Sequence, residues 1–196
     1  IGLAGYLLGL FGGLHLGFII LSYYIINLNL SIDITNWFSI LLQWSIYFFL
    51  LCTFHFIEFF VTAYYQENNL SYESYVINHS AAYTIAAITS WFEYWIEIQL
   101  FGSSWKLNSY TYSLGLFFLL AGQIVRTLAM STCGENFAHQ IAHSKPKDHQ
   151  LITHGIYRFV VYIVKYCIGC LVVYTLCILQ NTCTFIFLFL YPYLYL

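Results

Sequence analysis

Charged residues are scarce in this chain: six Lys and Arg and eight Asp and Glu make up 7% of its 196 residues. A typical soluble domain carries roughly 25% charged residues, so this chain cannot build an ordinary water-facing surface. The few cations also leave little to neutralise a phosphate backbone, which argues against nucleic acid as a partner. Because 61% of the residues are apolar, the composition predicts a protein that lies in lipid.

Charge is absent altogether from residues 1–26, which begin at Ile1. No basic region and no small-residue cleavage site precedes this run, so it is not typical of a signal peptide, and we expect the chain to be a fragment or a trimmed form. Six cysteines do not indicate a disulfide framework, because most of them lie in an uncharged apolar run near the C-terminal end, where cysteine usually packs as a reduced residue. These four are Cys167, Cys170, Cys177 and Cys183.

Long apolar runs alternate with polar breaks along the chain. A hydrocarbon core about 30 Å thick needs about 20 helical residues per crossing. The pattern therefore predicts an all-α fold, a multi-spanning integral membrane helical bundle with a polar cytosolic cofactor-binding loop. We expect about four crossings in residues 1–130, a polar segment at 131–160, and an apolar tail at 161–196 with one or two more crossings. The four crossings are predicted at 1–26, 37–63, 79–98 and 110–130.

The cations indicate how the bundle is oriented. Lys145, Lys147 and Arg158 all lie in the polar segment, and positive charge favours the cytoplasmic side of a membrane. Counting crossings back from that side places the loop 27–36, which has no Lys or Arg, on the opposite face. Lys106 is expected on that opposite face too, against the general trend.

Five ionisable residues fall inside the predicted crossings. An ionisable side chain at the bilayer centre costs about 2.5 to 3.5 kcal/mol on insertion scales, so each one implies a partner or a function. Either these residues pair between helices or lie near the interface, or they line a polar cavity. Near the end of its helix, Arg126 is expected to reach water. The other four form two pairs at helical spacing, His55 with Glu58 and Glu93 with Glu97.

The polar segment is rich in histidine. His139 and His143 are spaced i and i+4, which on a helix would put both imidazoles on one face, as a metal site requires. The segment nevertheless lacks a His-Glu-x-x-His arrangement, and Cys133 has no second cysteine near it, so no metal site is predicted. Further along, Gly155 permits a close backbone approach and Tyr157 offers a flat ring. Such a loop between membrane helices suits a polar cofactor with an aromatic base, although a surface turn would have the same composition.

Two ordered blocks carry a family resemblance. The first has Phe-His-Phe-Ile-Glu-Phe at 54–59, Tyr-Val-Ile-Asn-His-Ser at 75–80 and Ser-Trp-Phe-Glu at 90–93. The second has Asn-Phe-Ala-His at 136–139 and His-Gln-Leu-Ile-Thr-His-Gly-Ile-Tyr at 149–157, with lysines between. This sequence resembles the isoprenylcysteine carboxyl methyltransferases, integral membrane enzymes that methylate the C-terminal carboxylate of prenylated CaaX proteins. The match is specific over about residues 50 to 160.

The resemblance implies that the cofactor is S-adenosylmethionine and that the substrate is the prenylated C-terminal cysteine of CaaX proteins. It implies cofactor contacts at His149, Gln150, Leu151, Ile152 and Tyr157, where apolar groups can face the adenine ring. No catalytic base is demanded, because the carboxylate is already a nucleophile and the sulfonium a good leaving group, so the catalytic residues remain unassigned. The family also implies the endoplasmic reticulum membrane, with the active site towards the cytosol.

The resemblance stops soon after Tyr157. The family continues with Arg-His-Pro-x-Tyr, whereas this chain continues with Val-Tyr-Ile-Val-Lys at 161–165. We therefore hypothesise that residues from about Val161 are not homologous to the enzyme, which predicts weak or absent methyl transfer. A non-catalytic membrane scaffold or transporter-like subunit is the alternative from another class. A membrane reductase of similar helical architecture is a third, although the upstream block fits it poorly.

Overall fold

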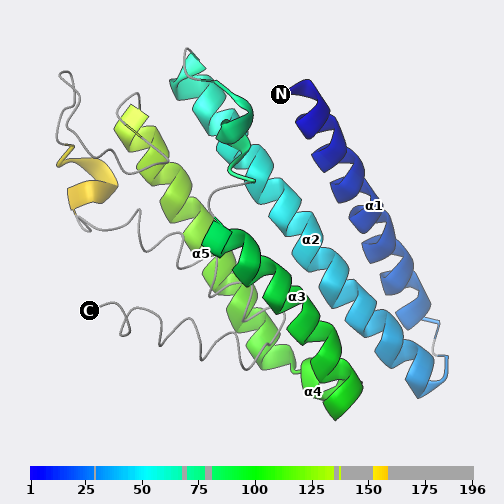
Figure 1. The fold of residues 1–196 in the computed structure, drawn as a ribbon. Coiled ribbons are helices and arrows are strands. Elements are labelled where there is room, and N and C mark those ends of the chain that lie inside the picture. The colour runs from blue at the N-terminus through cyan, green and yellow to red at the C-terminus, as the bar shows by residue number, and fades with distance from the viewer. Residues whose placement is uncertain (29, 68–69, 78–80, 135–136, 138–151, 159–196) are drawn as a thin grey trace.

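The computed structural model describes residues 1–28, 30–67, 70–77, 81–134, 137 and 152–158, and everything below concerns these residues. Every regular element among them is a helix, which confirms the all-α class. Four long helices lie side by side, with short helical turns between and after them (Figure 1). In chain order the elements are α1 (Gly2–Ile26), α2 (Ile32–Tyr65), η2 (Tyr72–Tyr75), α3 (Ala81–Phe101), α4 (Ser103–Lys106), α5 (Ser109–Cys133) and η4 (Gly155–Arg158).

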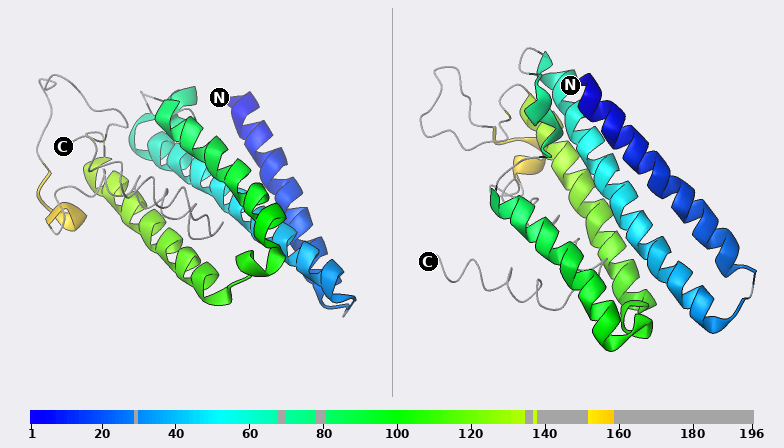
Figure 2. Two further views of the ribbon diagram at one scale, coloured as in Figure 1. Left: turned by 60° about the horizontal axis from the view of Figure 1, so that its bottom comes forward. Right: turned by 45° about the vertical axis from the view of Figure 1, so that its right-hand side comes forward.

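Helices α1 and α2 form an antiparallel hairpin along their whole length (Figures 1 and 2). Gly12 lets the two backbones approach, since a Cβ added there would lie 3.3 Å from Cys52 Cβ. Small residues at helix contacts are a usual means of packing helices in membranes, where apolar burial alone gives no driving force. One turn further on, His15 stacks on the Phe48 ring at a centroid distance of 5.0 Å. The outward face of α1 is almost entirely exposed and apolar, as lipid contact requires.

Aromatic rings fill the space between α2 and α3. Trp44 stacks on Tyr94 with ring centroids 5.0 Å apart, and Trp91 donates from its indole N–H to the Tyr47 hydroxyl at 3.1 Å. The Tyr94 hydroxyl lies 3.2 Å from the Ile40 carbonyl on α2. Large rings with a polar edge let two helices pack at a distance while still satisfying their buried hydroxyls.

The turn between α3 and α5 contains the short helix α4. Gly102 begins this turn with φ +83°, a conformation that favours glycine. Lys106 on α4 is fully buried and forms an ion pair with Glu97 on α3. Burial lowers the pKa of Lys106, and the hydrogen bond to Glu97 opposes this shift. Lys106 is the cation that ran against the charge trend, and here its charge is neutralised inside the protein.

Three helical segments in the described part of the chain are long and apolar enough to cross a membrane, namely Gly2–Ile26, Ile32–Tyr65 and Tyr112–Cys133. The first agrees with the predicted crossing 1–26. The second begins at Ile32, inside the stretch expected to be a loop at 27–36, and Asp33 occupies its first turn, where a carboxylate is favourable. The third predicted crossing appears as the 21-residue helix α3, which is not one of these three segments.

Candidate cofactor-binding site

The short helix η4 packs on the C-terminal half of α5. Ile156 and Tyr157 lie against the buried Ala129, together with Val125 one turn earlier on the same helix. The methyl of Ala129 leaves room for both side chains on this face of α5. We call η4 together with the part of α5 beneath it, residues 125–133, the η4 platform.

Gly155 brings the backbone of η4 against α5. Its φ of +60° lies in the left-handed region, and a Cβ added there would come within 2.8 Å of Thr132 Cγ2. Both the conformation and the space therefore require glycine at this position. The sequence predicted a close backbone approach at Gly155, and the structure shows that α5 is what it approaches.

The side chain of Tyr157 contacts α5 at two residues. The side chain packs against Ala129 in the platform, and its hydroxyl forms a side-chain hydrogen bond with Cys133 in the last turn of α5. The ring is only half-buried, so part of it stays accessible. A fixed and partly exposed aromatic ring is the kind of surface on which a flat base can pack.

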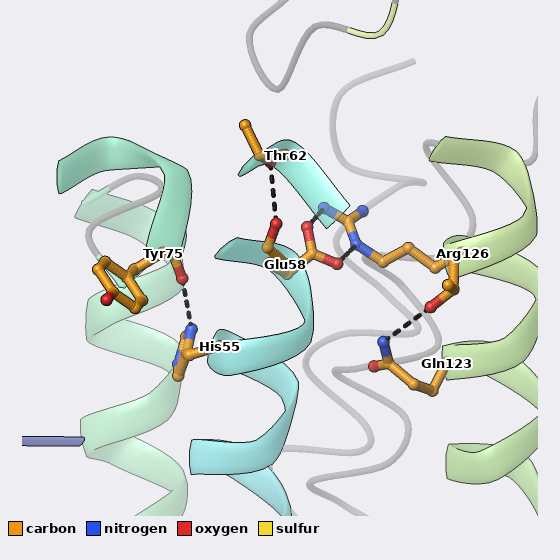
Figure 3. Close-up of polar contacts among 7 residues, drawn as sticks. His55, Glu58, Thr62, Tyr75, Gln123 and Arg126 are labelled. Atoms are coloured by element: carbon orange, nitrogen blue, oxygen red, sulfur yellow. Dashed lines mark hydrogen bonds and ion pairs between the residues drawn. The ribbon is translucent and has the colours of Figure 1, made fainter. Parts of the chain in front are cut away.

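Within the α5 part of the η4 platform, a buried ion pair joins α5 to α2. Arg126 donates from Nε to Glu58 Oε1 at 2.5 Å and from Nη2 to Glu58 Oε2 at 2.6 Å (Figure 3). The two side chains are 4% and 0% exposed. Two parallel hydrogen bonds match the fork of a guanidinium to a carboxylate, and this geometry makes them strong and directional. The expectation that Arg126 reaches water is therefore wrong, since its guanidinium points across the bundle to α2.

A second contact fixes the segment after α2. Buried His55 donates from Nδ1 to the Tyr75 carbonyl at 2.8 Å (Figure 3), and the Tyr75 ring stacks on Phe59 at a centroid distance of 4.2 Å. The next residue, Val76, has φ +58°. A β-branched residue in this region costs about 1–3 kcal/mol, so neighbouring contacts must hold it there. His55 and Glu58, which the sequence singled out, thus make structural contacts one turn apart on α2.

The end of α5 is held by Gln66, the residue that follows α2. Its side-chain Nε2 donates to the Gly134 carbonyl at 3.0 Å and to the Phe137 carbonyl at 2.6 Å. Gly134 has φ +55°, typical of the residue that ends a helix, and its carbonyl also accepts from the Phe137 N–H at 3.2 Å. Gln66 was not among the residues predicted from the sequence, although a polar side chain at the end of a long apolar helix was a signal for it.

Two of the five predicted cofactor residues are described by the structure, and both are half-buried: Ile152, before η4, and Tyr157 within it. The other three, His149, Gln150 and Leu151, lie outside the described residues, as do His139, His143, Lys145, Lys147 and the four C-terminal cysteines. Within the described ranges no group of His, Cys, Asp and Glu side chains has an arrangement suited to a metal ion. Glu97, for which the sequence predicted either a partner or a function, forms an ion pair with Lys106.

Comparison with known proteins supports the motif-based resemblance. The model of the isoprenylcysteine carboxyl methyltransferase (ICMT) family matches residues 114–196. This range includes the tail from Val161 onward, so it gives no support to a family boundary near residue 160.

Curated relatives agree with the family match. The chain is 39% identical over 113 residues to the protein-S-isoprenylcysteine O-methyltransferase of Tribolium castaneum, an alignment covering 58% of this chain and 40% of the relative. It is 36% identical over 120 residues to the human protein of that name, covering 60% of this chain and 42% of the relative. The chain therefore spans less than half the length of these two relatives.

A solved structure shares the fold. Its title is "Structure of the eukaryotic intramembrane Ras methyltransferase ICMT (isoprenylcysteine carboxyl methyltransferase) without a monobody". The TM-score is 0.75 at 29% sequence identity, and the superposition covers 91% of this chain and 61% of that one. Sequence and fold together confirm the resemblance predicted from the motifs: this chain is similar to members of the isoprenylcysteine carboxyl methyltransferase family.

Proposed function

We propose that this protein methylates the C-terminal carboxylate of a prenylated cysteine, with S-adenosylmethionine as the methyl donor. The observation that carries the proposal is the η4 platform, in which a fixed, half-buried Tyr157 ring lies at the end of a membrane helix in a chain related to methyltransferases. The prenylated cysteine of CaaX proteins is the substrate class, since the relatives are named for isoprenylcysteine. The matched relatives are named as enzymes, which favours methyl transfer over the non-catalytic scaffold.

The residue types in and before η4 suit an adenosine group. The Tyr157 ring and the Ile152 side chain offer apolar surface, and Thr153 and His154 beside them are exposed polar residues. Predicted contacts from His149, Gln150 and Leu151 belong to the same proposal. An adenine ring needs flat apolar contact on its faces and donors or acceptors at its edge, and the residue types of this segment supply both.

The proposed reaction needs little from acid or base groups. S-adenosylmethionine supplies a methyl group on a sulfonium, which is a good leaving group. The substrate carboxylate forms the new O–CH₃ bond as the S–CH₃ bond breaks, the sulfur keeps the electron pair as a neutral thioether, and no proton is transferred. The protein therefore contributes mainly by holding the two reactants in line and by keeping water away. The proposed function therefore requires no catalytic base.

The membrane setting suits such a substrate. A prenyl chain partitions into lipid, while its carboxylate stays near the interface, where the end of α5 and η4 lie together (Figure 1). The same end continues into the segment with Lys145 and Lys147, which the charge rule assigns to the cytoplasm. We propose a multi-pass protein of the endoplasmic reticulum membrane with its active site facing the cytosol.

Methyl transfer in lipid nanodiscs tests the proposal. The purified protein is incubated with S-adenosylmethionine labelled in the methyl group and with N-acetyl-S-farnesylcysteine, and the labelled methyl ester is counted. Unprenylated N-acetylcysteine is the matched control substrate. We expect ester only from the prenylated compound, and NADPH to have no effect. Absence of labelled ester from the wild-type protein under these conditions would contradict the proposal.

A pair of tyrosine variants locates the site. Tyr157→Ala removes the platform ring and should raise the KM for S-adenosylmethionine about tenfold or more, the order expected from losing a packed aromatic contact and its hydrogen bond. Tyr110→Ala is the matched control, because Tyr110 is 90% exposed at the start of α5. Equal activity of the two variants would refute the placement of the cofactor on η4.

A further inference from the structure

We propose that Gln66 is a positioning residue that holds the η4 platform in the arrangement that binds the methyl donor; this inference rests on the proposed function. Gln66 makes no described contact with η4. It acts through the end of α5, where its amide donates to the carbonyls of Gly134 and Phe137.

Two contacts, which we call ties, join α2 and the residue after it to α5 and the residue after it, and both have the same offset in residue number. Glu58 with Arg126, and Gln66 with Gly134, are each separated by 68 residues in the sequence. The two helices run in the same direction (Figure 1), so the second tie lies two helical turns, about 12 Å, beyond the first. Both ties therefore stabilise a single relative height of α2 and α5.

The ties bracket the part of α5 that carries η4. The residues of α5 in contact with η4 run from Ala129 to Cys133, whereas the ties attach at Arg126 and at Gly134. Arg126 thus fixes the start of this stretch and Gln66 fixes its end. A shift of either end would change the positions of Ala129 and Thr132 relative to η4.

Both carbonyls lie beyond the last residue of α5, and the Gly134 carbonyl also accepts from the Phe137 N–H. The last carbonyls of an α-helix and of the turn after it have no intrahelical partner. A glutamine amide has two N–H donors, one for each carbonyl, and Gln66 is fixed at its own base by a hydrogen bond from its backbone N–H to the Thr62 carbonyl at 2.8 Å. Half-buried Gln66 therefore connects the end of α2 to Gly134 and Phe137, which follow α5.

Loss of these donors should weaken cofactor binding and spare the transfer step. Without them the platform spends less time in its binding arrangement, and the apparent dissociation constant rises as that fraction falls. Once the donor is bound, the platform is formed and the reacting groups are unchanged. The expected signature is a raised KM and Kd for S-adenosylmethionine with an almost unchanged kcat.

Gln66→Glu tests the role in the full-length chain in nanodiscs. The variant keeps the shape of the side chain, removes its N–H donors and turns a carboxylate oxygen towards two carbonyl oxygens. We expect the Kd for labelled S-adenosylmethionine to rise about tenfold, the effect of losing one to two net hydrogen bonds. Gln66→Lys restores donors and should stay within about threefold of the wild type on the same scale. Gln99→Glu is the matched control, because Gln99 is exposed near the end of α3.

Four outcomes decide the matter. A raised Kd for Gln66→Glu, a normal kcat, a normal thermal midpoint and recovery by Gln66→Lys support the positioning role. A lowered thermal midpoint and lowered kcat with an unchanged Kd overturn it, because that pattern belongs to general structural support. If Gln66→Glu does not accumulate, Gln66→Met removes the donors without a charge and is measured in its place. Wild-type protein that binds no S-adenosylmethionine refutes the proposed function and this role with it, whereas wild-type binding with an unaltered variant refutes only the role.

Discussion

Glu58→Gln should be one of the most destabilising single changes in the described part of the chain. The structure gives Arg126 two charge-assisted hydrogen bonds, at 2.5 and 2.6 Å, to a carboxylate that is 0% exposed. Glutamine keeps the size of the side chain but leaves the guanidinium, itself 4% exposed, without a counter-charge. Breaking a buried pair by removing one partner costs about 3–5 kcal/mol, and we expect the free energy of unfolding to fall by that amount.

The double variant Glu58→Met with Arg126→Met tests whether the loss of stability comes from leaving one buried charge without its partner. Replacing both charges by apolar side chains of similar length leaves no charge unpaired, so this variant should be more stable than Glu58→Gln or Arg126→Met alone. The assay is reversible unfolding in mixed micelles with increasing SDS, followed by circular dichroism. The reasoning is refuted if Glu58→Gln changes the unfolding free energy by less than about 0.5 kcal/mol, the size of an ordinary surface substitution. The reasoning is also refuted if the effects of Glu58→Met and Arg126→Met on the unfolding free energy simply add in the double variant.

Two further predictions concern backbone contacts. Gly155→Ala should weaken S-adenosylmethionine binding more than Gly134→Ala does: both residues have positive φ, but an added Cβ meets Thr132 at 2.8 Å only at Gly155. Equal dissociation constants for the two variants would contradict the close approach of η4 to α5. His55→Phe should lower the unfolding free energy by about 1–3 kcal/mol, because it leaves the Tyr75 carbonyl without its donor. The same unfolding assay measures this, and a change smaller than that range would remove His55 from the structural account.

The helices could be predicted from the sequence because lipid imposes a simple rule on them. Apolar runs must be long enough to cross the hydrocarbon, and their backbone groups must be satisfied within the helix, so length and hydropathy suffice to locate them. Hydropathy does not locate helix starts as well. Helix α2 begins within the predicted polar loop, and the polar residue Asp33 is favourable there because it lies in the first turn of the helix.

The partners of the buried charges could be predicted only in part. The position of Glu58 and Glu97 inside predicted crossings indicated that each has either a partner or a function, because an ionisable group in lipid is costly when alone. It could not show that Arg126 and Lys106 are those partners, since the pairs join helices whose relative height is not encoded in either helix alone. Arg126 was expected to reach water for this reason: its distance from the helix end suggested an interface, whereas the register of α5 against α2 buries it.

The site was predictable as a segment and not as a geometry. Gly155 and Tyr157 stood out because their residue types have special conformational and packing properties. Their common support, the α5 face at Ala129, was not apparent, because a small apolar residue in a membrane helix carries no signal of its own. Gln66 was missed for a related reason, since its role depends on carbonyl groups that any residue type could supply.

Equilibrium binding of labelled S-adenosylmethionine to the protein in nanodiscs tests most directly whether the η4 platform holds the methyl donor. The account predicts saturable binding to the wild type, a Kd about tenfold higher or more for Tyr157→Ala, the order expected from losing a packed aromatic contact and its hydrogen bond, and a wild-type Kd for Tyr110→Ala. Absence of saturable binding to the wild type, or an unchanged Kd for Tyr157→Ala, would contradict it.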